Sequence, residues 1–161
     1  MKRIGVDLDT QQLTLFDDRG DVLGRWPVST AKNGAGEQDG SGCTPRGRHI
    51  VRAKIGAGAS PDTIFVGRRP QPERYSTALA ERFPEHDWIL ARILWLSGCE
   101  RGVNRLGKVD TMRRYIYIHG TPPELALGVP LSHGCIRMHP EAVIDLFDRV
   151  DVGTPVDIVA T

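Results

Sequence analysis

The sequence predicts a mainly β fold, either a β-sandwich or a mixed β-sheet, with one or two short α-helices. Short runs of alternating apolar and polar residues dominate both ends of the chain, and turn residues separate them. Only two segments have the spacing of apolar side chains that is typical of a helix. The chain has 161 residues, which suits a single domain, residues 1–161, around one core.

The first half of the chain is predicted to form successive strands. Residues 4–8 alternate, residues 13–15 repeat the pattern, and Asp-Asp-Arg-Gly at 17–20 supplies a turn. Residues 22–28 form the next expected strand. Residues 31–47 hold five glycines among polar residues, which predicts a mobile loop.

The second half is predicted to add strands and both helices. We expect strands at His49–Ile55, at Trp88–Leu96, which is apolar on both faces, and at Val156–Ile158. Pro72–Phe83 is the first expected helix, because Tyr75, Leu79 and Phe83 recur every four residues. The second follows Pro140, and its apolar stripe continues to Val150.

Composition excludes several classes of protein. Hydrophobic residues make up 40% and charged residues 25%, and the net charge of +1 with a pI near 7.8 indicates no nucleic-acid partner. Arg92 interrupts the longest apolar stretch, so no membrane span is expected. The run Ile4–Asp9 carries acids where a secretory signal needs an apolar core. We therefore expect a cytoplasmic protein, or a periplasmic one if a signal was trimmed from the sequence.

The pairing of Cys135 with His119 is the most informative chemical feature. Cys135 lies in the run Ser132-His133-Gly134-Cys135, and His119 ends the strand-like run Tyr115–Ile118. A thiol becomes a strong nucleophile when a neighbouring histidine takes its proton. Gly134 lets the backbone bend and direct N–H groups at one point. The sequence therefore predicts a nucleophile, a base and an oxyanion hole, the parts of an acyl-transfer enzyme.

These residues have two other interpretations, a zinc site and an inert core thiol. His119, His133, Cys135 and His139 could bind zinc, but the single residue between His133 and Cys135 matches no usual zinc spacing, so no metal is expected. Cys135 could be an inert core thiol, but its polar, electropositive neighbours favour a reactive one with a low pKa. His139 is expected to cap the helix that Pro140 begins.

The sequence around both residues resembles a known family. His119-Gly120-Thr121, followed about a dozen residues later by Ser132-His133-Gly134-Cys135-Ile136-Arg137, resembles the signature of the L,D-transpeptidase (YkuD-type) catalytic domain. Thr44-Pro45-Arg46-Gly47 resembles the Thr-Pro-x-Gly segment of that family, and Val152–Ile158 is similar to its closing strand. The resemblance spans nearly the whole chain and implies a mixed β-sheet of the YkuD type.

The chain departs from the family pattern at three places. Gly120 stands where many members carry serine, and His49 stands where an aromatic residue is common. Arg68–Trp88 aligns with no segment of the family. The remaining cysteines, Cys43 and Cys99, are expected to be incidental thiols.

The resemblance implies roles for the residues of the signature. Cys135 is expected to be the nucleophile, His119 its base, and the backbone carbonyl of Gly120 the group that orients the imidazole. The N–H groups of Gly134 and Cys135 are expected to bind the oxyanion.

The roles of three neighbouring side chains are less specific. His133 is expected either to shape the oxyanion site or to hydrogen-bond within the turn. Ser132 is expected to support the turn. Arg137 could bind a substrate carboxylate or form an ion pair with an acidic neighbour.

The resemblance also implies a substrate and a reaction without a cofactor. The donor would be a peptidoglycan tetrapeptide stem that acylates Cys135 and releases its terminal D-alanine. With water as acceptor the enzyme is an L,D-carboxypeptidase acting on soluble muropeptides during cell-wall recycling, which the expected cytoplasmic location favours. With an amine acceptor it is a cross-linking transpeptidase. Carbapenems are expected to acylate Cys135. The alternative outside enzymology is a catalytically silent muropeptide-binding relative.

Overall fold

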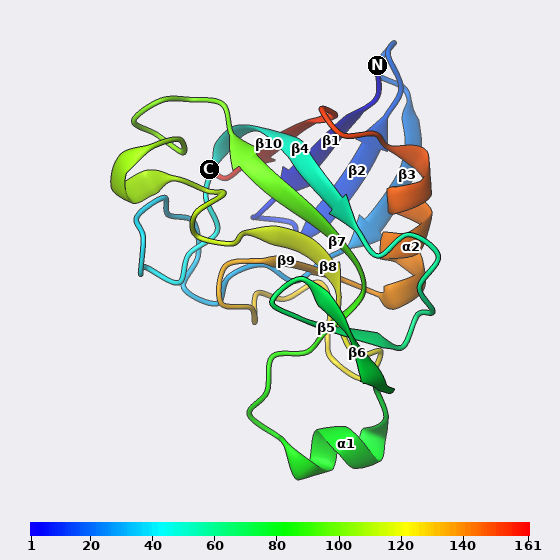
Figure 1. Cartoon of the computed structure of the whole chain (residues 1–161). Coiled ribbons are helices and arrows are strands. Elements are labelled where there is room, and N and C mark those ends of the chain that lie inside the picture. Colours follow the sequence, from blue (N-terminus) through cyan, green and yellow to red (C-terminus); the bar gives the residue numbers. More distant parts are fainter.

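A ten-stranded mixed β-sheet organises the computed structural model, which describes residues 1–161 (Figure 1). The mainly β prediction is confirmed, and two α-helices accompany the sheet. The first five strands are β1 (Arg3–Asp7), β2 (Gln12–Phe16), β3 (Val22–Pro27), β4 (Gly47–Ile55) and β5 (Thr63–Val66). The other five are β6 (Arg69–Arg74), β7 (Ile89–Gly98), β8 (Tyr117–Gly120), β9 (Ile136–Met138) and β10 (Pro155–Val159). The helices are α1 (Thr77–Arg82), α2 (Pro140–Arg149) and a 3₁₀ turn, η1 (Gly107–Val109).

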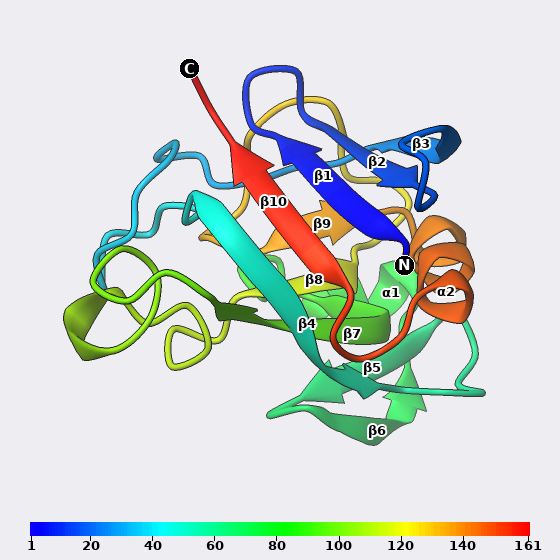
Figure 2. The same ribbon diagram turned by 90° about the horizontal axis from the view of Figure 1, so that it is seen from above.

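The sheet is curled and joins the two ends of the chain. The order is β3-β2-β1-β10-β4-β7-β5-β6, and β8 and β9 branch from β7. β1 and β10 pair in parallel, so the first and last strands lie side by side, as Figure 2 shows. β7 is long enough to pair with β4, β5 and β8 along different parts of its length. It therefore holds the branch that carries the signature residues.

Helix α2 covers one face of the β7–β8 region and closes the main core. His139 caps it by accepting a hydrogen bond from the Glu141 amide at 3.3 Å, as expected from the sequence. Its apolar stripe packs into a cluster of 22 buried residues that includes Ile118 and Ile136. A smaller cluster around Phe65, on which Cys135 borders, is separate from this core.

The prediction of a helix over Pro72–Phe83 is wrong in its first half. Residues up to Arg74 extend the edge strand β6, where Pro72 is tolerated because an edge residue need not donate to a neighbouring strand. The helix begins only after Ser76, whose hydroxyl accepts from the Leu79 amide at 3.1 Å. Leu79 is its one buried side chain.

The other predicted elements are present with shifted ends. The strand expected at Tyr115–Ile118 is β8, which begins at Tyr117, because Tyr115 has a positive φ of 57° and is not extended. The strand expected at Trp88–Leu96 is β7. Neither helix has the length and apolarity to cross a membrane.

No space for a side chain is left at Gly120 between β8 and β7, so a larger residue there should destabilise the fold. A Cβ at this position would collide with the backbone carbonyl of Leu90, its partner in the β7–β8 ladder. We expect Gly120→Ala to lower the free energy of unfolding by about 1–3 kcal/mol, measured by urea denaturation. Gly5→Ala is the control, since its Cβ would meet only the movable ring of Phe16, at 3.1 Å. Equal losses in both variants would contradict this account.

Candidate active site

The parallel pairing of β8 with β9 puts the signature residues on one face. Its register sets His119 opposite Arg137 and Ile118 opposite Ile136. Side chains alternate along a strand, so Ile118 and Ile136 enter the main core while His119 and Arg137 point the other way. Cys135 comes one residue before β9 and lies against Tyr117, whose amide donates to its sulfur at 3.3 Å. The expected nucleophile and base therefore share a face.

The imidazole of His119 is held by the backbone. The side chain is fully buried, and its Nδ1 lies 2.7 Å from the carbonyl oxygen of Gly120. A carbonyl can only accept, so Nδ1 carries the proton and Nε2 is left with a lone pair. Nε2 has no hydrogen-bond partner. A buried nitrogen without a partner is costly unless it has another use, such as accepting a proton.

The thiol of Cys135 is neutral at rest. Its S–H donates to the carbonyl of Tyr115 at 3.4 Å, and no hydrogen bond joins it to His119. Burial raises the pKa of Cys135 to about 12, against the opposing effects of the Tyr117 amide and Arg137. Burial also lowers the pKa of His119. The sequence-based expectation of a low thiol pKa is therefore wrong for this state, because desolvation outweighs the nearby positive charge.

The turn before Cys135 is built by two hydroxyl groups. Ser132 Oγ donates to the Cys135 carbonyl at 2.6 Å and accepts from the Gly134 amide at 3.2 Å. The hydroxyl of Thr44, which is fully buried, donates to the Gly134 carbonyl at 2.9 Å and accepts from the Ala31 amide at 3.0 Å. Thr44 is the first residue of the Thr-Pro-x-Gly segment. That motif is the sequence signal that associates Thr44 with the site.

The two expected oxyanion donors differ in their availability. The Gly134 amide is engaged by Ser132, whereas the Cys135 amide makes no hydrogen bond. Gly134 has a φ of +137°, a conformation that side chains rarely adopt. This backbone geometry explains why glycine precedes the sulfur.

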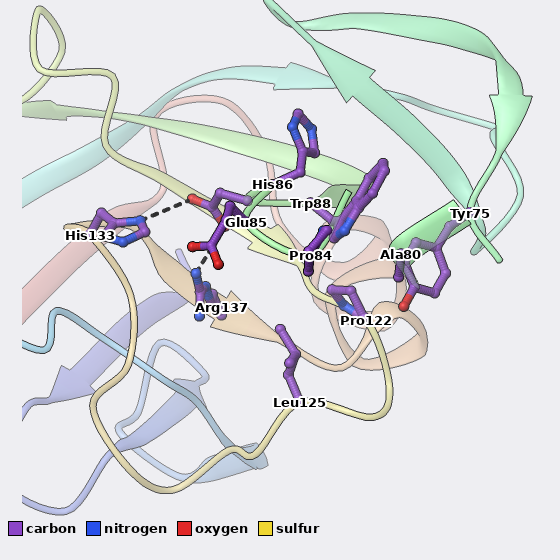
Figure 3. Close-up of a pocket in the computed structure, with 11 residues that line it drawn as sticks. Tyr75, Ala80, Pro84, Glu85, His86, Trp88, Pro122, Leu125, His133 and Arg137 are labelled. Atoms are coloured by element: carbon purple, nitrogen blue, oxygen red, sulfur yellow. Dashed lines mark hydrogen bonds and ion pairs between the residues drawn. The ribbon is translucent and has the colours of Figure 1, made fainter. Parts of the chain in front are cut away.

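Arg137 forms the ion pair that was one of its two expected roles. Its Nη2 lies 2.9 Å from Oδ1 of Asp87, and its side chain is only 9% exposed. The other carboxylate oxygen of Asp87 lies 3.6 Å from Nδ1 of His133, whose ring is largely exposed (Figure 3). Asp87 belongs to the segment that matched no part of the family, so no sequence signal pointed to it.

A cleft opens beside this ion pair. It has a volume of about 300 Å³. The end of the Arg68–Trp88 segment forms one side, Pro122 and Leu125 form another, and His133 and Arg137 line a third (Figure 3). The wall also contains Tyr75 and Trp88, whose rings meet edge to face with centroids 5.6 Å apart. The cleft can hold part of a peptide next to His133 and Arg137.

Arg68, the first residue of the Arg68–Trp88 segment, packs against aromatic side chains. Its guanidinium lies 4.8 Å from the ring centroid of Trp95 and 5.2 Å from that of Tyr115, and it donates to the Tyr117 hydroxyl at 3.1 Å. The backbones of these two tyrosines contact the sulfur of Cys135. Arg68 has no acidic partner, whereas Arg74 is paired with Asp62.

The other two cysteines form no disulfide. The carbonyl of Cys43 accepts from Arg114 at 2.6 Å, next to the turn that Thr44 supports. Cys99 is exposed. Arg114 is a residue that sequence reasoning missed, and its positive charge also acts to lower the pKa of Cys135.

Comparison with known proteins identifies the family. The model of the L,D-transpeptidase catalytic domain, YkuD, matches residues 1–158. The chain is 41% identical over 46 residues to the probable L,D-transpeptidase YbiS of Escherichia coli K12, which is 29% of this chain and 15% of YbiS. It is 51% identical over 39 residues to the putative L,D-transpeptidase YqjB of Bacillus subtilis, or 24% of this chain and 22% of YqjB. The chain belongs to the YkuD L,D-transpeptidase family, although these matches span under a quarter of either relative.

Solved structures share the fold. An L,D-transpeptidase from Mycobacterium smegmatis superposes with a TM-score of 0.61 at 23% identity, covering 99% of this chain and 58% of that one. The L,D-transpeptidase LdtMt1 in complex with imipenem gives 0.57 at 20% identity, covering 98% and 58%. The fold class predicted from the sequence is thus the fold of this family.

The raised thiol pKa predicts an unusual pH dependence of alkylation. Ionisation of a thiol with a pKa of about 12 is incomplete at any moderate pH, so the rate at Cys135 should still rise between pH 9 and 10.5. The measurement is iodoacetamide labelling followed by peptide mapping, in a Cys43→Ser/Cys99→Ser background. A rate that levels off below pH 8 would mean that the resting thiol is not held neutral by burial.

Proposed function

We propose that this chain is a cysteine-dependent acyl-transfer enzyme that acts on peptidoglycan tetrapeptide stems. The observation that carries the proposal is the shared face of Cys135 and His119, with the imidazole Nε2 unpartnered and Nδ1 bound to the Gly120 carbonyl. Membership of the L,D-transpeptidase family supplies the substrate class. A silent peptide-binding relative would have no use for a buried imidazole nitrogen left without a partner.

The proposed reaction passes through an acyl-enzyme. His119 Nε2 takes the thiol proton, and the sulfur attacks the carbonyl of the third stem residue. The Cys135 amide donates to the oxyanion, and the Gly134 amide joins it when it leaves the Ser132 hydroxyl. The C–N bond breaks, and terminal D-alanine leaves with the proton from His119. An acceptor then attacks the thioester and frees Cys135.

For the acceptor we propose water, which makes the enzyme an L,D-carboxypeptidase of soluble muropeptides in cytoplasmic recycling. Support comes from the end of the Arg68–Trp88 segment, which Asp87 ties to His133 and Arg137 and which forms one wall of the cleft that these two residues line. Such a wall restricts the approach of a second peptide stem. The alternative is the cross-linking transpeptidase that the family name describes. Cell fractionation checks the location.

Incubation with purified tetrapeptide muropeptide tests the reaction and its acceptor together. We expect tripeptide and free D-alanine, identified by mass spectrometry, and no cross-linked dimer when excess amine acceptor is added. Cys135→Ala should abolish turnover because the nucleophile is lost, whereas Cys43→Ala and Cys99→Ala should retain most of it. Efficient dimer formation would replace the carboxypeptidase proposal with the transpeptidase one. Wild-type turnover by Cys135→Ala would remove both.

β-Lactams provide a second test of the nucleophile. A structural relative is described in complex with imipenem, and an activated thiol at Cys135 should open the same ring. We expect intact-mass spectrometry to show an increase equal to the drug, mapped to Cys135. Prior alkylation of the thiol should block the increase. An adduct at Cys43 or Cys99 instead would show that Cys135 is not the activated residue.

Arg68 is proposed to bind the terminal carboxylate of the donor. Arg137 is neutralised by Asp87, whereas Arg68 has no acidic partner and lies against the residues that contact the sulfur. Arg68→Gln should raise KM by about ten- to a hundredfold, as expected for loss of a charge-assisted hydrogen bond. Arg69→Gln, on the same hairpin but exposed, is the matched control. Equal kinetics of both variants would assign the carboxylate to another group.

A further inference from the structure

Asp87 links the unaligned segment to the signature residues through two contacts. One carboxylate oxygen accepts from Arg137 of β9 at 2.9 Å, and the other lies 3.6 Å from the His133 ring of the catalytic turn. The side chain of Asp87 is 37% exposed, whereas that of Arg137 is 9% exposed. The carboxylate of Asp87 therefore lies at the edge of the site and contacts the buried guanidinium of Arg137.

Arg137 places a positive charge next to His119. The β8–β9 register sets Arg137 directly opposite His119, on the same face. A guanidinium beside a fully buried imidazole opposes its protonation, and burial opposes it further. The only direct polar partner of the ring is a neutral carbonyl, that of Gly120. Protonation of His119 therefore requires a compensating negative charge nearby.

Asp87 carries that charge. Its carboxylate acts to raise the pKa of His119. Burial acts to raise the pKa of Asp87 itself, but Arg137 and the protonated form of His119 outweigh burial and lower that pKa. The same carboxylate also acts to raise the pKa of Cys135, although burial and the Tyr117 amide affect that thiol more. Arg137 and Arg114 act on the thiol in the opposite direction.

We infer that Asp87 is a positioning residue that offsets the charge of Arg137 and stabilises the imidazolium formed when the Cys135 proton moves to Nε2 of His119. The inference deepens the proposed function, because it rests on Cys135 and His119 as the reacting pair. It adds to that pair Asp87, which lies outside the Ser-His-Gly-Cys run. The proton moves from sulfur to nitrogen, and the thiolate and imidazolium then coexist beside the Asp87–Arg137 pair.

The size of the effect follows from the partial exposure of Asp87. An opposite charge close to a titrating group in a buried setting shifts its pKa by roughly one to three units, but solvent screens a carboxylate that is a third exposed. We therefore expect removal of the charge to lower the population of the thiolate–imidazolium pair by about three- to tenfold, where tenfold corresponds to one pKa unit.

The test is alkylation of Cys135 by the uncharged reagent iodoacetamide, in the Cys43→Ser/Cys99→Ser background. At pH 7 the thiolate depends on proton transfer to His119, so Asp87→Asn should react about three- to tenfold more slowly. At pH 10 the thiol ionises directly with His119 neutral, and removal of the carboxylate should leave the rate equal or higher. A merely structural role would slow alkylation at both pH values by the same factor.

Two further variants complete the experiment. Asp87→Glu restores the charge and should keep at least half of the rate at pH 7. Glu81→Gln removes an exposed charge from the same segment, outside the cleft, and should stay within twofold of the wild type at both pH values. Circular dichroism checks that each variant is folded.

The inference is overturned if Asp87→Asn reacts within twofold of the wild type at pH 7, reacts faster there, or is slowed equally at pH 7 and 10. Alkylation needs no muropeptide. A wild-type enzyme that fails to cleave tetrapeptide while showing the expected crossover would therefore refute the proposed substrate and leave the role of Asp87 intact.

Discussion

The parallel pairing of β8 with β9 is the constraint on which the rest of the site depends. The two strands are short, at four and three residues. β8 is held by pairing with β7, β9 is held by pairing with β8, and both pack against the main core. Because the register is fixed by Ile118 and Ile136 in that core, His119 and Arg137 must point to the opposite face. A shift of one residue would bury the imidazole in the apolar core and remove it from the thiol.

Burial on this face sets the electrostatics of the site. A fully buried imidazole and a thiol with a pKa near 12 favour the uncharged pair. A neutral resting thiol is protected from oxidation, because reactivity follows thiolate character. The ionised pair must then be favoured by groups around it, and the Asp87–Arg137 ion pair lies directly across the β8–β9 ladder from His119. Reactivity in this chain is thus a property of a small charge network and not of the cysteine alone.

The segment from Arg68 to Trp88 has two distinct connections to this network. Its first residue, Arg68, packs on the rings of Trp95 and Tyr115, and the carbonyl of Tyr115 accepts from the Cys135 thiol. Near its other end, Asp87 binds the arginine of the signature. Between them, β6 forms an edge of the sheet and α1 projects away from it (Figure 1). The Arg68–Trp88 segment therefore supplies both an arginine without an acidic partner and the aspartate that pairs with Arg137.

Much of the fold and the identity of the site residues could be predicted from the sequence. Alternation of apolar residues located the outer strands, because one face of each is buried, and the stripe after Pro140 located α2. The Ser-His-Gly-Cys run identified the turn, since only glycine suits its backbone at 134. The strand at β6 was missed because the spacing of three aromatic and aliphatic residues mimics a helix, whereas pairing with β5 decided the outcome.

Tertiary structure alone decided which charges face one another. The sequence separates Asp87 from Arg137 by fifty positions, and no local pattern indicates that they meet. It also left two roles open for Arg137, and the fold selected the ion pair. The thiol pKa was mispredicted from neighbouring residue types, because a desolvation cost depends on everything packed around the sulfur and not on the residues beside it in the chain. The sequence by itself thus determined which chemical groups are present in the site, whereas their protonation states and hydrogen-bond or ion-pair partners depend on long-range packing.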